Sequence, residues 1–193
     1  DAYRYTAIRA NFSSNVYHRV NHDGLNRYLA GCLPCIRSYP EPEPYALAAE
    51  LAQLQGVSPE EVCVTNGATE AIYLIAQAFR GSHSAVWIPT FSEYADACRL
   101  HKHRVEGISS LEKLTDDEGI FWLCNPNNPT GQTWDAATLR RLIVAYPRKL
   151  FVIDQSYALF TEKEVLSVAE TVKLPNVLLL HSMTKCYAVP GLR

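Results

Sequence analysis

The sequence predicts an α/β protein with a mostly parallel sheet, and three observations support this fold class. Short runs rich in Val, Ile, Leu and aromatic residues recur along the 193 residues. Stretches with apolar residues at spacings of three and four separate most of these runs. Several runs are continuously apolar, which is typical of strands that are covered on both faces. Alternation of this kind favours parallel strands joined by right-handed crossovers.

The expected elements follow from these patterns. Strands are expected at residues 62–65, 85–88, 103–106, 120–124, 150–154 and 177–182. Helices are expected at residues 45–55, 69–79, 91–101 and 136–145. The sequence SPEE at residues 58–61 is typical of a capping box with proline at the first helical position. A short helical turn should therefore precede the first strand.

The first forty residues differ from the rest of the chain. They lack a clean apolar periodicity, contain Pro34 and Pro40, and lead into the sequence EPEP at residues 41–44. We expect residues 1–40 to form an extended N-terminal arm and residues 41–193 to form a domain. A hydrophobic content of 48% is sufficient for one core of ordinary size.

Composition narrows the partners that the chain can bind. Lys and Arg number 18 against 20 Asp and Glu, which gives a net charge of -2, and no block of like charges stands out. We therefore expect neither a nucleic acid nor an anionic membrane as partner. No apolar run approaches the roughly 20 residues of a bilayer span, and no secretory signal pattern opens the sequence. The expected location is the cytoplasm.

Six cysteines raise the question of a metal or disulfides. Only Cys32 and Cys35 have a spacing suited to metal ligands, and a second pair is missing. We expect reduced thiols and no metal site, with a metal or redox role for this pair as the alternative. His101 and His103 are expected at an exposed helix end, and a metal-binding pair is again the alternative.

Chemically distinctive residues follow directly after the expected strands. In an open parallel sheet the ligand site lies beyond the carboxyl ends of the strands, so these residues should converge. The residues that follow the strands in this way are Gly67, Ala68, Thr69, Phe91, Asn128, Asp154, Tyr157, Ser182, Thr184 and Lys185.

Two features could bind a phosphate group. The turn at Gly67 leads into a helix, whose free amides and positive dipole end would face an anion, although glycine also serves ordinary turns. Arg193 could clamp a phosphate through two hydrogen bonds, and a solvated arginine is the alternative.

Three further residues have a catalytic and a structural explanation. Asp154 ends a buried strand and needs a cationic partner, which a protonated pyridine nitrogen would supply; a helix cap or a structural ion pair is the alternative. Lys185 would form an imine with an aldehyde more readily if burial lowered the pKa of its amine, yet a surface lysine explains it equally. Phe91 could stack on a flat cofactor or fill the core.

Three motifs in this order resemble the fold-type I pyridoxal-phosphate enzymes, specifically the class I and II aminotransferases. They are NPNNPTG at residues 125–131, DQSY at 154–157 and SMTKCYAVPGLR at 182–193. The resemblance implies the large pyridoxal-phosphate-binding domain of the aspartate-aminotransferase-like fold, a three-layer α/β/α structure with a mostly parallel sheet. It also implies that the family's C-terminal small domain is absent from this chain.

The resemblance assigns a role to each residue of the site. Lys185 would form the Schiff base with pyridoxal 5'-phosphate and move the substrate proton, and Asp154 would pair with the pyridine nitrogen. Asn128 and Tyr157 would bind the phenolic oxygen, and Phe91 would stack on the ring. The residues implied to bind the phosphate are Gly67, Ala68, Thr69, Ser182, Thr184 and Arg193.

Within this superfamily the sequence is most similar to the histidinol-phosphate aminotransferase group, which includes threonine-phosphate decarboxylase. The shared sequences are SYPEP at residues 38–42 and TNGATE at 65–70. The resemblance implies that Tyr39 reaches the phosphate of a partner subunit, and hence a homodimer with shared sites. Asn15, in the sequence FSSN, is implied to contact the substrate.

The expected activity is therefore that of an aminotransferase, similar to histidinol-phosphate aminotransferase, that acts on an amino acid or amino phosphate. A decarboxylase using the same cofactor is the alternative, because the sequences FSEY at 91–94 and TKCYAVPG at 184–191 are similar to that enzyme. A regulatory domain that binds the cofactor without catalysis is a third reading, but no DNA-binding pattern precedes the domain.

Overall fold

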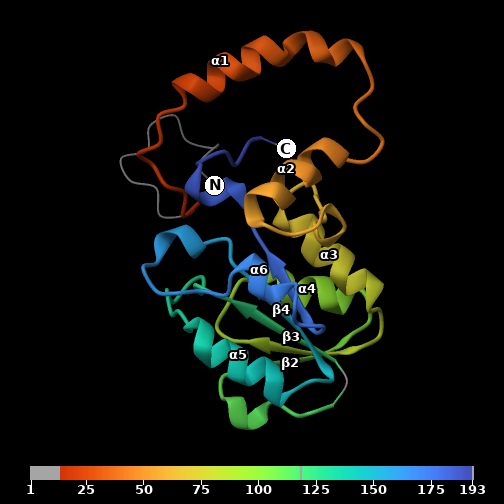
Figure 1. Cartoon of the computed structure of the whole chain (residues 1–193). Coiled ribbons are helices and arrows are strands. Elements are labelled where there is room, and N and C mark those ends of the chain that lie inside the picture. The colour runs from red at the N-terminus through yellow and green to blue at the C-terminus, as the bar shows by residue number, and fades with distance from the viewer. Residues whose placement is uncertain (1–13, 118, 193) are drawn as a thin grey trace.

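The body of the molecule is a five-stranded sheet with the strand order β2-β1-β3-β4-β5. The computed structural model describes residues 14–117 and 119–192 (Figure 1). All neighbouring strands are parallel, so the expected α/β class is confirmed. The strands are β1 (His83–Trp87), β2 (Arg104–Ile108), β3 (Gly119–Cys124), β4 (Lys149–Asp154) and β5 (Val177–Leu180).

The helices follow the apolar periodicity of the sequence closely. The α-helices are α1 (Asp23–Cys32), α2 (Tyr45–Gln55), α3 (Ala68–Ala78), α4 (Glu93–Leu100), α5 (Ala136–Ala145), α6 (Val168–Thr171) and α7 (Met183–Cys186). Single turns of 3₁₀ helix lie at Leu33–Arg37, Pro59–Glu61, Leu111–Lys113 and Ala158–Phe160. The turn at Pro59–Glu61 has the expected capping box, in which Ser58 and Glu61 bond each other's backbone amides.

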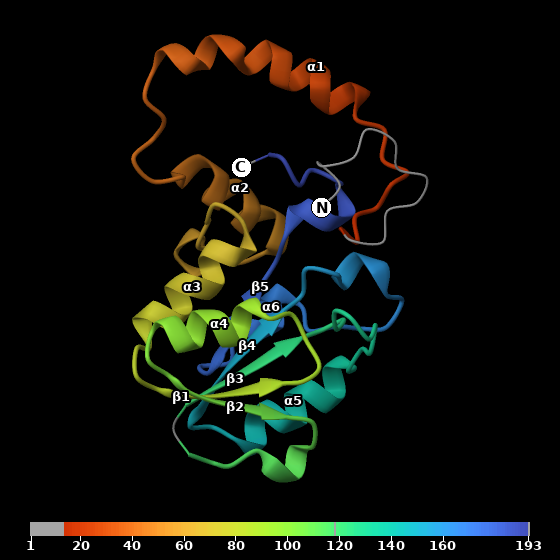
Figure 2. The same cartoon turned by 180° about the vertical axis from the view of Figure 1, so that it is seen from behind.

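Helices cover both faces of the sheet, which gives the three layers. Because side chains alternate along a strand, Phe121 and Phe151 face one side while Trp122 and Val152 face the other. The first side packs against α5 in one core. The second packs against α3 and α4 in another core. Figures 1 and 2 show the sheet between these layers.

The strand expected at residues 62–65 is not formed. The backbone at Val62 is extended, with φ -117° and ψ 120°, but this segment pairs with no strand of the described chain. Val62 and Val64 are half-buried and Cys63 is exposed. A strand needs a hydrogen-bonded neighbour as well as suitable side chains, and the two edges of the described sheet are formed by β2 and β5.

The expectation of an extended arm is wrong for residues 23–37, which form α1 and the helical turn after it. The signal was present in the sequence, since Leu25, Tyr28, Leu29 and Cys32 have the spacing of one helix face. No side chain of α1 is buried. Figures 1 and 2 show this helix lying away from the sheet.

His103 is also placed differently from the expectation, because it lies in the core and not at an exposed helix end. Its Nε2 lies 2.8 Å from the carbonyl oxygen of Ala76, and its Nδ1 lies 2.8 Å from the hydroxyl of Ser84. The same hydroxyl accepts a hydrogen bond from Trp122 Nε1 at 3.3 Å. The imidazole therefore serves to satisfy buried polar groups between strand and helix.

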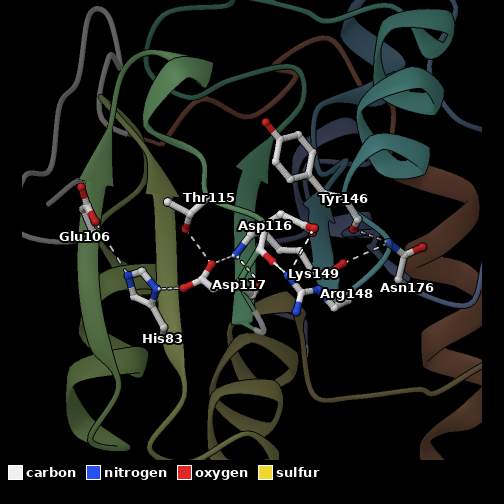
Figure 3. Close-up of polar contacts among 9 residues, drawn as sticks. All are labelled: His83, Glu106, Thr115, Asp116, Asp117, Tyr146, Arg148, Lys149 and Asn176. Carbon is white, nitrogen blue, oxygen red and sulfur yellow. Dashed lines mark hydrogen bonds and ion pairs between the residues drawn. The ribbon is translucent and has the colours of Figure 1, made fainter.

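A polar network joins the amino-terminal ends of the strands (Figure 3). Lys149, at the start of β4, is only 1% exposed, and its Nζ donates to Asp117 Oδ1 at 2.7 Å. Asp117 Oδ2 lies 2.6 Å from Nδ1 of His83, at the start of β1. The hydrogen bond from Lys149 holds the pKa of the Asp117 carboxyl well below its usual range, and bonds from His83 and Thr115 act in the same direction.

Two further observations concern the described residues alone. None of their helices is long and apolar enough to cross a membrane. No three of their His, Cys, Asp or Glu side chains are grouped so that they could hold a metal ion. All six cysteines are free thiols, with Cys98 and Cys124 buried.

Candidate active site

A pocket lies at the carboxyl-terminal edge of the sheet, beside the loops that follow β1, β3, β4 and β5. Ten residues singled out from the sequence line it together, and five others complete the lining. These fifteen are Asn66, Gly67, Ala68, Thr69, Ile72, Phe91, Tyr94, Cys124, Asn128, Asp154, Ser156, Tyr157, Ser182, Thr184 and Lys185.

The strand order explains where the pocket opens. The chain reverses direction across the sheet between β1 and β3, because β2 lies on one side of β1 and the later strands lie on the other. The loops after β1 and β3 therefore diverge and leave a crevice. Phe91 comes from the first of these loops and Asn128 from the second.

The N-terminus of α3 forms one wall of the pocket. Gly67 is its N-cap with φ 87°, a backbone conformation that favours glycine, and no side chain among residues 14–117 and 119–192 caps the helix. The first-turn amides of a helix have no acceptor within the helix. Those of Ala68 and Thr69 are therefore available, with the positive end of the helix dipole, to an anion in the pocket.

The loop at residues 125–131 is fixed by two of its three asparagines. Asn125 exchanges hydrogen bonds with the backbone of Trp134, at 3.0 Å and 2.7 Å. Asn127 donates to the carbonyl of Pro89 and to the hydroxyl of Thr130, both at 2.8 Å. The side-chain amides of Asn125 and Asn127 are thus bonded to neighbouring residues. Asn128 is the asparagine that lines the pocket.

Asp154 ends β4 with its carboxylate at the floor of the pocket, where it is 5% exposed. Oδ1 accepts the backbone amide of Ser156 at 2.8 Å, and Oδ2 accepts the hydroxyl of Tyr94 at 2.7 Å. No ion pair within the described part of the chain involves this carboxylate. Burial, together with the negative charge of Asp154, raises the pKa of the Cys124 thiol to about 11.

Lys185 lies in α7, opposite Tyr157. Its Nζ is 6.0 Å from the centre of the Tyr157 ring and 3.4 Å from the carbonyl oxygen of Ser14. Burial raises the pKa of the Tyr157 phenol, and a hydrogen bond with Asn15 acts in the opposite direction. Ser182 caps α7 by accepting the amide of Thr184 at 3.3 Å.

The N-terminal segment reaches the pocket from across the sequence. The amide of Tyr17 donates to the carbonyl of Lys185 at 2.8 Å, and His22 Nε2 lies 2.8 Å from the carbonyl of Tyr187. Asn15 Nδ2 donates to Asn128 Oδ1 at 3.4 Å. The residue predicted to contact the substrate therefore lies beside two residues predicted to contact the cofactor.

Two predicted site residues of the described chain do not line the pocket: Asn15, which contacts it through Asn128, and Tyr39, which is fully exposed on the loop between α1 and α2. The predicted phosphate ligand Arg193 lies outside the described residues. Conversely, Tyr94, Cys124 and Ser156 line the pocket although they were not predicted as site residues. Tyr94 could have been found from its position on the first turn of the helix after β1, one turn beyond Phe91.

Comparison with known proteins decides the family. A family model described as Aminotransferase class I and II matches residues 33–193. The chain belongs to this family. Class I and II aminotransferases and their relatives include pyridoxal-phosphate-dependent transaminases and decarboxylases, and the family binds pyridoxal phosphate.

Two relatives of this chain are named for different activities. Histidinol-phosphate aminotransferase of Shewanella oneidensis is 30% identical over 203 residues, which cover 97% of this chain and 51% of that protein. The crystal structure of L-threonine-O-3-phosphate decarboxylase from Porphyromonas gingivalis is 41% identical with a TM-score of 0.91, over 95% of this chain and 57% of that one.

A third comparison concerns the fold alone. Histidinol-phosphate aminotransferase from Sinorhizobium meliloti, solved with pyridoxal-5'-phosphate, has a TM-score of 0.82 at 18% identity and covers 93% of this chain and 53% of that one. The chain thus spans about half the length of the relatives that it matches. The expected fold of the large domain is confirmed by these structures.

The pocket of this aminotransferase-family chain fits the cofactor of its family. An uncapped helix N-terminus suits a phosphate, and a buried carboxylate without an ion-pair partner in the described chain suits a protonated pyridine nitrogen. An aromatic ring and a lysine amine line the same pocket. Each chemical part of pyridoxal phosphate therefore has a matching group.

Proposed function

We propose that the whole protein is a pyridoxal-phosphate-dependent enzyme that breaks a bond at the α-carbon of an amino acid or amino phosphate. One observation carries the proposal. Lys185, Asp154 and the free amides of α3 come from three distant parts of the chain and line one pocket. Packing alone gives no reason for an amine, a buried carboxylate and an uncapped helix to meet.

Each group in the pocket has a task in this proposal. When bound, pyridoxal phosphate supplies an electron sink for the substrate's α-carbon. The amides of Ala68 and Thr69 and the hydroxyls of Ser182 and Thr184 would hold its phosphate, with Arg193 as a further donor. Phe91 would pack on the face of the ring.

The remaining groups act on protons and orientation. Asp154 would hold the proton on the pyridine nitrogen, and Asn128 and Tyr157 would bind the oxygen on the ring. The Lys185 amine would hold the cofactor at its aldehyde and, once displaced by the substrate's amine, would be free to carry the proton at the substrate's α-carbon. Asn15 would contact the substrate from the N-terminal segment.

Release of carbon dioxide from a phosphorylated amino acid is the first of two candidate reactions. It is favoured by the 41% identity and TM-score of 0.91 with the Porphyromonas gingivalis decarboxylase. Amino-group transfer is the second, and it is favoured by the family model and by the 30% identity with the Shewanella oneidensis aminotransferase.

One experiment separates these reactions. The whole protein, loaded with pyridoxal phosphate, is incubated with threonine phosphate labelled at its carboxyl carbon, and separately with histidinol phosphate and 2-oxoglutarate. Labelled carbon dioxide without glutamate supports the decarboxylase. Glutamate without carbon dioxide supports the aminotransferase, and neither product from these or other amino acids would refute the proposed function.

The role of Lys185 is tested by the cofactor itself. We expect the wild type and Lys163→Ala, which changes an exposed lysine, to bind pyridoxal phosphate covalently after borohydride reduction, with the label on the peptide that contains Lys185. Lys185→Ala should not be labelled. Equal labelling of all three proteins would exclude Lys185 as the cofactor lysine.

We also propose that the described part of the N-terminal arm, residues 14–40, lies against a second copy of the chain. Apolar side chains on and beside this arm are exposed, and a large exposed apolar surface marks an interaction site. Tyr39 would then reach the phosphate of the partner subunit. The exposed side chains are Tyr28, Leu33, Ile36, Tyr39, Tyr45 and Leu54.

A further inference from the structure

Tyr94 lines the pocket and contacts Asp154, and the roles proposed above do not include it. Its side chain is 1% exposed, and its hydroxyl donates to Asp154 Oδ2 at 2.7 Å. The other oxygen of Asp154 accepts the amide of Ser156 at 2.8 Å. Each carboxylate oxygen thus has one fixed donor from the protein.

The position of the Tyr94 hydroxyl is determined by its neighbours. The ring stacks on Trp122, with centroids 5.8 Å apart and an angle of 24° between the planes. Phe91 meets it edge-on, with centroids also 5.8 Å apart and an angle of 82°. Since two large rings confine the phenol, its hydroxyl cannot turn away from Asp154 without disturbing the core.

The hydroxyl keeps its proton under all ordinary conditions. Burial raises the pKa of the Tyr94 phenol well above its usual value, and the negative charge of Asp154 raises it further. A neutral phenol can only donate to an ionised carboxylate. The hydrogen bond therefore has a fixed direction, from Tyr94 to Asp154.

We propose that Tyr94 is a positioning residue that acts through Asp154 to keep the proton on the pyridine nitrogen of the bound cofactor. The inference rests on the proposed function, because it requires pyridoxal phosphate in the pocket. A hydrogen bond from Tyr94 to Asp154 Oδ2 favours the ionised form of the carboxylate. In the pair of carboxylate and pyridine nitrogen, the single proton then stays on the ring, where it makes the cofactor an electron sink.

A purely structural role for Tyr94 would give a different result. Tyr73 provides the matched comparison, because its hydroxyl also donates to a carboxylate, that of Glu93, at 2.9 Å. Tyr73 packs against the same core but does not line the pocket. Tyr73→Phe and Tyr94→Phe both remove a hydroxyl that donates to a carboxylate, yet only the second removes a donor to Asp154.

The experiment follows the ring nitrogen directly. The whole protein is loaded with pyridoxal phosphate labelled with ¹⁵N in the ring, and the ¹⁵N chemical shift is recorded against pH. In Tyr94→Phe we expect the ¹⁵N shift at neutral pH to move toward that of an unprotonated pyridine, because Asp154 without its donor takes a larger share of the proton. One hydrogen bond to a charged group should change this share by about tenfold. In Tyr73→Phe the ¹⁵N shift should match the wild type at every pH.

A second variant carries the test if Tyr94→Phe does not fold. Replacement of Tyr94 by 3-fluorotyrosine nearly keeps the volume of the ring and makes the phenol a stronger donor, so the ¹⁵N shift should move further toward that of a protonated pyridine. Unchanged ¹⁵N shifts in both Tyr94 variants would overturn the inference and leave the proposed function intact. A wild type that does not bind pyridoxal phosphate would instead refute the proposed function.

Discussion

Two adjacent asparagines in the loop after β3 have opposite roles. Asn127 is buried and takes part in three side-chain hydrogen bonds, with Pro89, Thr90 and Thr130. Asn128 is half-buried and faces the pocket. The first asparagine holds the loop, and the second lines the pocket, where it accepts a hydrogen bond from Asn15.

Asn127→Ala should therefore lower the free energy of unfolding by about 2–3 kcal/mol, since it leaves buried polar partners unsatisfied. Asn128→Ala should cost less than about 1 kcal/mol and should instead change the absorption spectrum of bound pyridoxal phosphate. Urea denaturation of the apoprotein measures the first effect and titration with the cofactor the second. A larger loss of stability for Asn128→Ala would contradict this division.

At the scale of elements, the network in Figure 3 joins β1, β3 and β4 at the edge opposite the pocket. The two partners of its Lys149–Asp117 ion pair are buried unequally. The Lys149 side chain is 2% exposed and the Asp117 side chain is 42% exposed. Loss of the Asp117 carboxylate would leave the Lys149 ammonium buried without its ion-pair partner. Loss of the Lys149 ammonium would leave the Asp117 carboxylate partly exposed to solvent.

Asp117→Asn should thus destabilise the protein more than Lys149→Met. We expect a loss of about 2 kcal/mol for Asp117→Asn, which is below the roughly 3–5 kcal/mol of a fully buried pair because solvent screens the exposed carboxylate. Lys149→Met should cost less than about 1 kcal/mol, since methionine fills similar space and Asp117 keeps its bonds with His83 and Thr115. Thermal or urea denaturation of both variants at pH 7 would reveal the order, and the reverse order would refute it.

The same network predicts how stability depends on pH. The pKa of Asp117 is lower in the folded protein than its ordinary value of 3.8, so its contribution is complete above that value and is lost as the pH falls below it. The difference in unfolding free energy between the wild type and Asp117→Asn should shrink as the pH falls below about 4. Denaturation at a series of pH values measures this difference, and one that grew in acid would contradict the network.

At the scale of the whole molecule, the exposed arm makes a prediction about assembly. If a second copy covers the arm, Ile36→Asp should convert a dimer into a monomer, because a carboxylate would be buried without a partner. Val144→Asp on α5 is a suitable control, since Val144 is also exposed but lies far from the arm in sequence. Sedimentation velocity separates the species. Dimers in both variants, or a monomeric wild type, would count against the proposed interface.

The sequence predicted most of the sheet and helices because their signals are local. The ranges of α2 and α5 agree with the expectation at both ends, and those of α3 and α4 differ by at most two residues at an end. Apolar spacing fixes the face that a helix buries, and a continuously apolar run is stable only between two layers. The convergence of residues from four loops followed from the parallel arrangement of the strands.

The sequence could not predict features that depend on a partner in space. Residues 62–65 have the composition of a strand, but pairing in a sheet depends on which strands are adjacent. His103 has polar neighbours in the sequence, which favoured an exposed position. Its partners Ser84 and Ala76 come close to it only in the folded chain. The contact between Tyr94 and Asp154 joins residues 60 positions apart, and neither sequence motif implies the other.

The contacts between the N-terminal segment and α7 have a consequence for the order of folding. His22 meets Tyr187 across 165 positions of sequence, and Ser14 meets Lys185 across 171. The entropy of closing so long a loop must be overcome before these contacts form, whereas each strand of the sheet finds its neighbour over a shorter distance. The sheet can therefore assemble first, and the surroundings of the lysine amine are completed in a late step.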